Sequence, residues 1–130
     1  MILPITILIC GGRDLNHADV WNALDRDCLD FVADKLDISR PRVFRVIHGG
    51  AKGADRAAGE WAKSEGAKVT VYPANWKAHG KAAGPIRNRQ MLDDGKPDVV
   101  VALPGGRGTA NMIWQAEDRG IPVVDIEVRP

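Results

Sequence analysis

Three short apolar runs in this sequence each end in a glycine-rich turn, and this repeated pattern restricts the fold more than any other feature. The apolar runs cover residues 5–10, 45–48 and 99–103. The turns that follow them begin at Gly11, Gly49 and Pro104. Parallel sheets repeat this unit of strand, turn and helix, and such turns all emerge at the carboxyl edge of the sheet. We therefore expect the three turns to lie together at one edge.

The rest of the chain alternates between strand-like and helix-like segments, which predicts an α/β fold in three layers with a mostly parallel sheet of about five strands. A length of 130 residues is typical of one domain, so we expect a single domain over residues 1–130. The expected strands cover residues 5–10, 43–48, 68–72, 98–103 and 121–126. The expected helices cover residues 17–36 with Asn16 as the cap, 55–64, 85–91 and 109–119. The aliphatic run at 98–103 is typical of a central strand.

Residues 74–84 form the one long stretch without a strand or helix pattern, so we expect a loop there that acts as a lid. Trp76 in this loop could stack on a base, although a tryptophan that pins the loop to the core is the more common arrangement. The other tryptophans are assigned to packing on apolar helix faces; they are Trp21, Trp61 and Trp114. Residues 93–96 are expected to form a solvated turn.

The composition excludes several classes of protein. A net charge of +1 provides no general attraction for nucleic acid, and no apolar run approaches the ~20 residues that span a bilayer. The N-terminus carries no targeting signal, so we expect a cytoplasmic protein. Cys10 and Cys28 fall where buried free thiols are usual in a reducing compartment. The histidines form no short-range metal-binding pair, and we expect neither a metal nor a cofactor.

The turn at residues 104–109 carries the strongest local signal. Its glycines, Gly105, Gly106 and Gly108, would expose successive backbone N–H groups to a phosphate, and Thr109 could cap the following helix and donate its hydroxyl to the same anion. The alternative is a tight turn that needs positive φ, with Thr109 as a simple cap. We favour phosphate binding because similar turns follow two other strands.

The turn at residues 49–55 differs from the known phosphate-binding loops, since it has neither a Gly-Lys-Ser/Thr triplet nor the dinucleotide spacing. Its expected ligand-binding residues are Gly49, Gly50, Lys52, Gly53 and Asp55. Lys52 could neutralise a phosphate. Asp55, at a helix start, could accept hydrogen bonds from ribose hydroxyls or could simply favour the helix dipole.

Basic side chains are expected near the same edge of the sheet. Gly12 and Arg13 follow the first strand, and Arg13 offers a planar donor fork to phosphate or carboxylate, with a salt-bridged surface turn as the alternative. Arg87, Asn88 and Arg89 open a helix, where cations oppose the helix dipole unless an anion lies nearby. Helical geometry directs Arg87 and Arg89 to different faces, so we expect only one of them to reach a ligand.

Four segments together resemble the YspA branch of the SLOG superfamily: Gly11-Gly12-Arg13-Asp14, residues 48–55, residues 84–91 and residues 104–109. The resemblance covers nearly the whole chain. It implies a Rossmann-like fold and a nucleotide or nucleotide-derived ligand, whose phosphate the two longer glycine turns would hold. Arg13 and Arg87 would add charge, and Asp55 or Asn88 would bind sugar hydroxyls. Whether the protein is a sensor or an enzyme of unknown reaction stays open.

Two groups within the superfamily extend what the resemblance implies. Arg87, Met91 and the 104–109 turn are similar to the LOG phosphoribohydrolases, which implies a homodimer and cleavage of nucleoside monophosphates, with Arg87 and Asp55 as catalytic candidates. However, Met112 occupies the position of the LOG catalytic glutamate, and a thioether cannot act as a general base. The 50–55 turn resembles DprA, which implies single-stranded nucleic-acid binding; we rank it second because the chain has few aromatic side chains for base stacking.

Overall fold

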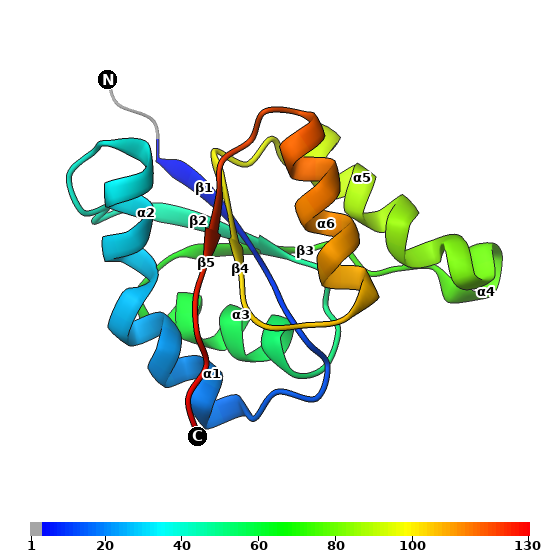
Figure 1. Cartoon of the computed structure of the whole chain (residues 1–130), viewed down its shortest axis with the longest axis horizontal. Helices are drawn as coiled ribbons and strands as arrows, with labels where there is room; N and C mark the ends of the chain where they lie inside the picture. The colour runs from blue at the N-terminus through cyan, green and yellow to red at the C-terminus, as the bar shows by residue number, and fades with distance from the viewer. Residues whose placement is uncertain (1–3) are drawn as a thin grey trace.

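Five strands form one sheet that runs through the middle of the molecule (Figure 1). The computed structural model describes residues 4–130. The strands are β1 (Ile5–Cys10), β2 (Phe44–His48), β3 (Lys68–Val71), β4 (Val99–Ala102) and β5 (Val123–Asp125). Their order is β3-β2-β1-β4-β5, and every neighbouring pair is parallel. The predicted α/β fold with a parallel sheet is therefore confirmed.

The central strand is β1, whereas the sequence favoured the 98–103 run for that place. Leu8 in β1 lies opposite Ile47 of β2 and Val100 of β4. β4 is also buried along its whole length, one position away from the centre. All interior strands of a parallel sheet are covered on both faces, so an aliphatic composition cannot rank one interior strand above another.

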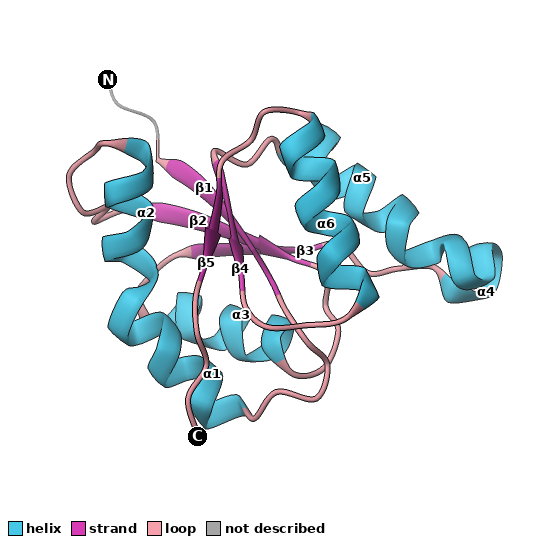
Figure 2. Ribbon diagram, viewed as in Figure 1, coloured by secondary structure: helices cyan, strands magenta, loops and turns pink. Residues whose placement is uncertain are grey.

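Helices cover both faces of the sheet and complete the three layers, as Figure 2 shows. The helices on one face are α1 (His17–Ala23), α2 (Leu29–Leu36) and α3 (Ala54–Ser64). Those on the other face are α5 (Ala83–Gly95) and α6 (Arg107–Asp118). Because side chains alternate along a strand, Ile7 and Ile9 of β1 pack against the first set, and Leu8 and Cys10 against the second.

The predicted helix over residues 17–36 is confirmed as one helical stretch, in which a π-helical segment (Leu24–Cys28) joins α1 to α2. Asn16 caps it, since the Asp19 N–H donates to Asn16 Oδ1 at 3.1 Å. Cys10 and Cys28 are free and buried, as expected, and burial raises the pKa of each thiol to about 12. Both thiols are therefore uncharged at neutral pH and are poor nucleophiles.

The expected loop over residues 74–84 is wrong, because most of this segment is helical. It contains α4 (Trp76–His79), a 3-10 turn (Gly80–Ala82) and the start of α5. Asn75 caps α4 by accepting from the Ala78 N–H at 3.0 Å, and Pro85 fits in the first turn of α5, where no N–H is needed. The small residues and glycines of this segment give no helical spacing of apolar residues, so these short helices were not predicted.

The expected solvated turn at residues 93–96 is instead the end of α5. The helix continues through Gly95, and Lys96 ends it in the left-handed conformation with a φ of 46°. A left-handed residue at this position is the usual way for a helix to stop, although glycine or asparagine is more common there than lysine. The apolar pattern of this short segment was too weak to extend the predicted helix.

Two of the tryptophans lie on the surface. Trp61 is 1% exposed beside Phe44, as expected, but Trp114 is 64% exposed on α6 and Trp76 is 55% exposed. Trp114 is two residues from the buried Met112, which is about 200° around the helix, so it faces solvent rather than the sheet. Trp76 therefore does not pin its segment to the core. No helix among residues 4–130 has the length and apolar character needed to cross a bilayer.

Candidate functional site

The three glycine turns lie together at the carboxyl edge of the sheet, as predicted, and hydrogen bonds join them into one wall. The Gly12 N–H donates to the Pro104 carbonyl at 2.8 Å, and the Ala54 N–H donates to the Gly12 carbonyl at 3.1 Å. The turn after β1 therefore bridges the turns after β2 and β4. This wall exists only once all three strands have paired.

Two glycines are required because the turns pack so closely. A Cβ atom on Gly11 would lie 2.7 Å from Ala54 Cβ and 2.8 Å from Leu103 Cβ. Gly53 has a φ of +80°, and a Cβ atom there would lie 2.5 Å from the carbonyl oxygen of Arg13. Close-packed interiors do not tolerate such contacts. These two glycines allow the turns to meet one another.

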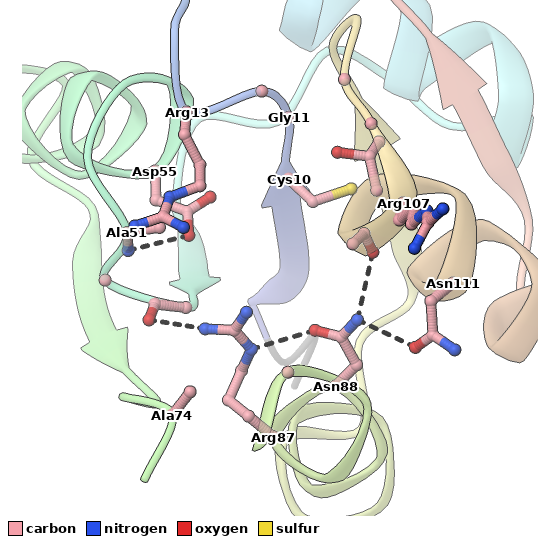
Figure 3. Close-up of a pocket in the computed structure, with 18 of the residues that line it drawn as sticks. Cys10, Gly11, Arg13, Ala51, Asp55, Ala74, Arg87, Asn88, Arg107 and Asn111 are labelled. Atoms are coloured by element: carbon pink, nitrogen blue, oxygen red, sulfur yellow. Dashed lines mark hydrogen bonds between the residues drawn. The ribbon is translucent and has the colours of Figure 1, made fainter. Parts of the chain in front are cut away.

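A cavity of about 1010 Å³ lies against this wall (Figure 3), a size that suits a small-molecule ligand. Twelve of the thirteen predicted ligand-binding residues line it, namely Gly12, Arg13, Gly49, Gly50, Lys52, Asp55, Arg87, Asn88, Gly105, Gly106, Gly108 and Thr109. Gly53 is the exception, because it packs against the turn after β1. The structure thus brings the predicted residues together, and their roles in binding stay predictions.

The cavity is also lined by residues that the sequence reasoning missed. They include Cys10, Arg56, Lys81, Arg107 and Asn111. Arg107 lies inside the predicted 104–109 turn and Asn111 follows one helical turn later, so both could have been inferred from the start of α6. Arg56 and Lys81 carried no signal, because the sequence does not say which face of a helix meets the cavity. Arg89 is exposed and absent from the residues around the cavity.

Arg87 is held inside the cavity by two hydrogen bonds that tie separate turns together (Figure 3). Its Nη1 donates to the Gly49 carbonyl at 2.8 Å, and its Nε donates to Asn88 Oδ1 at 3.0 Å. Asn88 Nδ2 in turn donates to the Gly108 carbonyl at 3.2 Å and to Asn111 Oδ1 at 3.1 Å. The turn after β2 and the start of α6 are therefore linked through two adjacent residues of α5.

In the turn after β2, two backbone N–H groups donate to side chains of the protein itself. The Gly50 N–H donates to His48 Nδ1 at 3.0 Å, and the Ala51 N–H donates to Asp55 Oδ2 at 3.1 Å. These amides are not free to bind a phosphate. What this turn presents to the cavity is the carboxylate of Asp55, held in place by its own loop.

The start of α6, by contrast, leaves backbone donors open. The helix begins at Arg107 after Gly106, and no side chain caps it. Thr109, for which we expected a capping role, is the third residue of the helix and does not fill that role. The first N–H groups of an α-helix have no partner within the helix. An anion in the cavity would meet these donors and the positive end of the helix dipole.

Burial shifts the charge states of the groups around the cavity. Desolvation raises the pKa of Asp55 to about 6, although the Ala51 N–H and Arg87 both act to lower it. Desolvation lowers the pKa of the Arg87 guanidinium. Burial, with Lys63 and Arg87 nearby, lowers the pKa of His48 to about 4, so this histidine is neutral at pH 7. Asp55 thus titrates close to neutral pH, as groups at functional sites often do.

Positive charge is concentrated at the cavity. Its basic residues are Arg13, Lys52, Arg56, Lys81, Arg87 and Arg107. Asp14 and Asp55 are the acidic ones, so the cavity has a formal charge of +4 and the rest of the chain, whose total is +1, has −3. Positive charge focused in a concave site attracts anions. Residues 4–130 contain no group of three or more histidine, cysteine or acidic side chains arranged to hold a metal ion.

Two solved structures of low sequence identity have a similar fold. DprA from Streptococcus pneumoniae matches 94% of this chain with a TM-score of 0.66 and 18% identity, and the chain spans 50% of that DprA chain. The molybdenum cofactor binding protein from Rippkaea orientalis matches 96% of this chain and 77% of its own, with a TM-score of 0.63 and 20% identity. These likenesses confirm the Rossmann-like fold.

Sequence comparison identifies the family. The gene 61 protein of Mycobacterium phage D29 is 40% identical over 132 residues, which cover 95% of this chain and 98% of that protein. Residues 5–79 match the YspA, cpYpsA-related SLOG family, and this segment includes the first two glycine turns. Since the match covers more than half of the chain, and the phage protein is similar over nearly its whole length, this chain belongs to the YspA, cpYpsA-related SLOG family.

Proposed function

We propose that the cavity binds a nucleotide or a nucleotide-derived small molecule, with a phosphate group at the start of α6. The observation that carries this proposal is the union of three glycine turns into one wall beside a cavity of formal charge +4. An uncapped helix start supplies N–H donors, and Arg107 in its first turn supplies charge. Both features favour an anion over a neutral ligand.

The other side of the cavity suits the sugar of such a ligand. Asp55 is an acceptor, and the amide of its own loop fixes its orientation. Asn88, our other expected partner for hydroxyls, already uses its oxygen for Arg87 and its amide for Gly108 and Asn111. We therefore assign hydroxyl binding to Asp55 and a positioning role to Asn88. Arg13 and Arg87, which also line the cavity, add positive charge.

Gly106→Val tests the phosphate site. A Cβ atom on Gly106 would have no atom within 4 Å, so valine fits without a clash. Its backbone angles, a φ of −98° and a ψ of −141°, lie outside the main regions for residues with a Cβ, so circular dichroism is used first to select conditions in which the variant is folded. Its branched side chain would occupy the space in front of the helix start. We expect affinity for nucleotides, measured by calorimetry with AMP, GMP, ADP and ATP, to fall at least ~10-fold through loss of charge-assisted hydrogen bonds.

Ala110→Val is the matched control, because Ala110 is exposed one turn later on α6 and is not among the residues around the cavity. It should bind as the wild type does. Equal affinity of Gly106→Val and wild type would remove the α6 turn from the proposal. Absence of binding by the wild-type protein to all four nucleotides, together with no co-purifying ligand in native mass spectrometry, would overturn the proposed function itself.

A second candidate function is the hydrolysis of an N-glycosidic bond, and Asp55 is the observation in its favour. Met112 is 1% exposed in the core between α6 and the sheet, so its position supplies no acid to the cavity. Asp55 is a buried carboxyl group at the cavity whose pKa of about 6 suits proton transfer near neutral pH. Water would add to the anomeric carbon of the sugar as the bond to the nucleobase breaks, and Asp55 would accept the proton that the water loses.

Chromatography of nucleoside monophosphates incubated with the protein tests this second function. We expect release of free base that Asp55→Asn abolishes, since an amide cannot accept a proton. Asp14→Asn is the control, because Asp14 is an exposed carboxyl group at the same cavity. No release above buffer would reject the hydrolase and leave the binding proposal intact.

Single-stranded nucleic acid as the ligand stays a prediction with less support. Trp76 is the one aromatic residue among the described residues that line the cavity, and binding of single strands depends on several stacking platforms. Oligonucleotide affinity that falls steeply with salt would favour it. The homodimer implied by the LOG resemblance also stays a prediction, which native mass spectrometry of the purified protein would test.

A further inference from the structure

We propose that the ligand carries at least two phosphoryl groups, as a nucleoside diphosphate does, with one at the start of α6 and the second on the Arg87 side of the cavity. This inference rests on the proposed function and specifies the ligand class. Three observations carry it: the amount of charge at the cavity, the unpaired state of Arg87 and the direction of a hydrogen-bond chain between α5 and α6.

The first observation is that the positive charge exceeds what one phosphate can neutralise. A phosphate monoester carries about −1.5 to −2 at pH 7. The cavity has a formal charge of +4 while the rest of the chain has −3, so the excess is local and is not a property of the whole surface. One monoester would leave about half of this charge without a counter-ion. Two linked phosphoryl groups carry more negative charge than one monoester and would neutralise more of it.

The second observation is the state of Arg87. Its guanidinium is half-buried, and no carboxylate among residues 4–130 lies within the 4.0 Å limit of an ion pair. Two of its five N–H groups are used, one by the Gly49 carbonyl and one by Asn88 Oδ1. The other N–H groups of Arg87 remain free to donate to a ligand in the cavity, which Arg87 lines. Asp55 is close enough to act on Arg87 through its charge but forms no ion pair with it, so the guanidinium has no direct anionic partner, and a phosphoryl group would supply one.

The third observation concerns which atoms α6 offers to a ligand. A guanidinium can only donate, so Arg87 fixes the amide of Asn88 with its oxygen toward Nε and its nitrogen toward Asn111 Oδ1. Gln115 Nε2 donates to the same oxygen of Asn111 at 2.8 Å. The side-chain oxygen of Asn111 is therefore occupied, and only its NH₂ group is free to donate to a ligand.

This free NH₂ group adds a donor to the α6 side of the cavity. Within residues 4–130, no buried side-chain nitrogen or oxygen lacks a partner, so Asn111 Nδ2, which has none, is accessible. Asn111 lies one turn after Arg107, and both line the cavity (Figure 3). The α6 side therefore presents several donors, separate from those of Arg87. Two donor groups joined by Asn88 suit two linked phosphoryl groups.

Calorimetry with matched probes tests the inference, in buffer with EDTA so that no metal bridges the ligand. The probes are AMP against ADP, GMP against GDP, and inorganic phosphate against pyrophosphate. We expect each diphosphate to bind at least ~10-fold more tightly than its monophosphate, because additional charge-assisted hydrogen bonds form. Equal affinities within each pair would overturn this inference and leave the proposed function standing. Binding of none of these probes would count against both.

Arg107→Gln shows whether the preference comes from two sites. Arg107 is exposed at the start of α6, so its loss should not affect folding. Loss of Arg107 weakens the site at the start of α6 for either ligand, whereas the Arg87 side still holds the second phosphoryl group. We therefore expect both affinities to fall and the diphosphate to keep its preference over the monophosphate. Arg89→Gln is the control, since Arg89 is exposed, on α5 and outside the cavity. Loss of the diphosphate preference in Arg107→Gln would reject the two-site arrangement, and so would an equal fall in affinity in Arg89→Gln, which would mean general charge screening.

Discussion

Gly53→Ala is expected to lower the free energy of unfolding by about 4 kcal/mol, because it adds a steric clash to a backbone conformation that alanine disfavours. Gly53 has a φ of +80°, and its Cβ atom would lie 2.5 Å from the Arg13 carbonyl oxygen and 2.6 Å from that of Gly12. The clash is with backbone, so no side-chain rotation can relieve it. Urea denaturation measures the loss, and thermal unfolding should show a midpoint lower by about 12 °C.

Gly66→Ala gives the cost of a positive φ in open space. Gly66 has a φ of +79°, and no atom lies within 4 Å of the added Cβ, whereas Gly53 combines its clash with a ψ of −122° that only glycine adopts readily. Gly66→Ala should lose only about 1 kcal/mol, the cost of the left-handed conformation. If the two variants lost the same stability, the close approach of the turns after β1 and β2 would have no energetic importance. The larger loss in Gly53→Ala would instead establish the joint between these turns as part of the fold.

Asp55→Asn is expected to stabilise the free protein by about 3 kcal/mol at pH 7.5 and to have no such effect near pH 4. The pKa of Asp55 is about 6 in the folded protein against an ordinary value of 3.8, because burial disfavours the charged carboxylate. Between these values the folded state keeps a proton that the unfolded state releases. The free energy of unfolding therefore falls as the pH rises from about 4 to about 6, and is level above that range. Asparagine avoids this cost, and its oxygen can still accept the Ala51 N–H.

His48 contributes a slope of the opposite sign. Its pKa is lowered from 6.5 to about 4, mainly by burial, so between these values the unfolded state holds a proton that the folded state lacks. This group makes the free energy of unfolding rise as the pH rises from about 4 to about 6.5. In the wild-type protein the contributions of Asp55 and His48 offset each other. In Asp55→Asn the rise due to His48 remains.

Urea denaturation from about pH 4.5 to pH 8 measures both slopes. Asp14→Asn is the control, because Asp14 is an exposed carboxyl group at the same cavity and should leave the wild-type profile unchanged. An Asp55→Asn protein that is no more stable than wild type at pH 7.5 would contradict the prediction. The variant should also bind nucleotides more weakly, since Asp55 is the proposed acceptor for sugar hydroxyls; gain of stability with loss of binding is expected where a site stores strain.

Local sequence patterns predicted the parts of this protein that depend on local chemistry. The alternation of apolar runs and glycine turns predicted five strands, their parallel arrangement and the shared edge at which the turns meet. The loop predicted for residues 74–84 was wrong because α4 and the start of α5 depend on local capping interactions, such as that of Asn75, within a stretch of small residues. The packing predicted for Trp114 was wrong because residues 112–114 are all apolar, and this run covers more than one face of α6.

Within the site, the sequence by itself determined which residues meet, and tertiary structure decided what each of them can offer. Parallel strands bring their carboxyl ends to one edge, which accounts for ten of the twelve predicted residues that line the cavity; the other two, Arg87 and Asn88, lie on α5. Which amides are free depends on the conformation of each turn: His48 and Asp55 accept those of the turn after β2, and α6 keeps its own. The pKa of Asp55 comes from burial, and the bonds of Arg87 and the free NH₂ group of Asn111 come from partners far along the chain. Hydrogen bonding and desolvation depend on neighbours in space, and for these residues the neighbours are set by how the helices pack on the sheet.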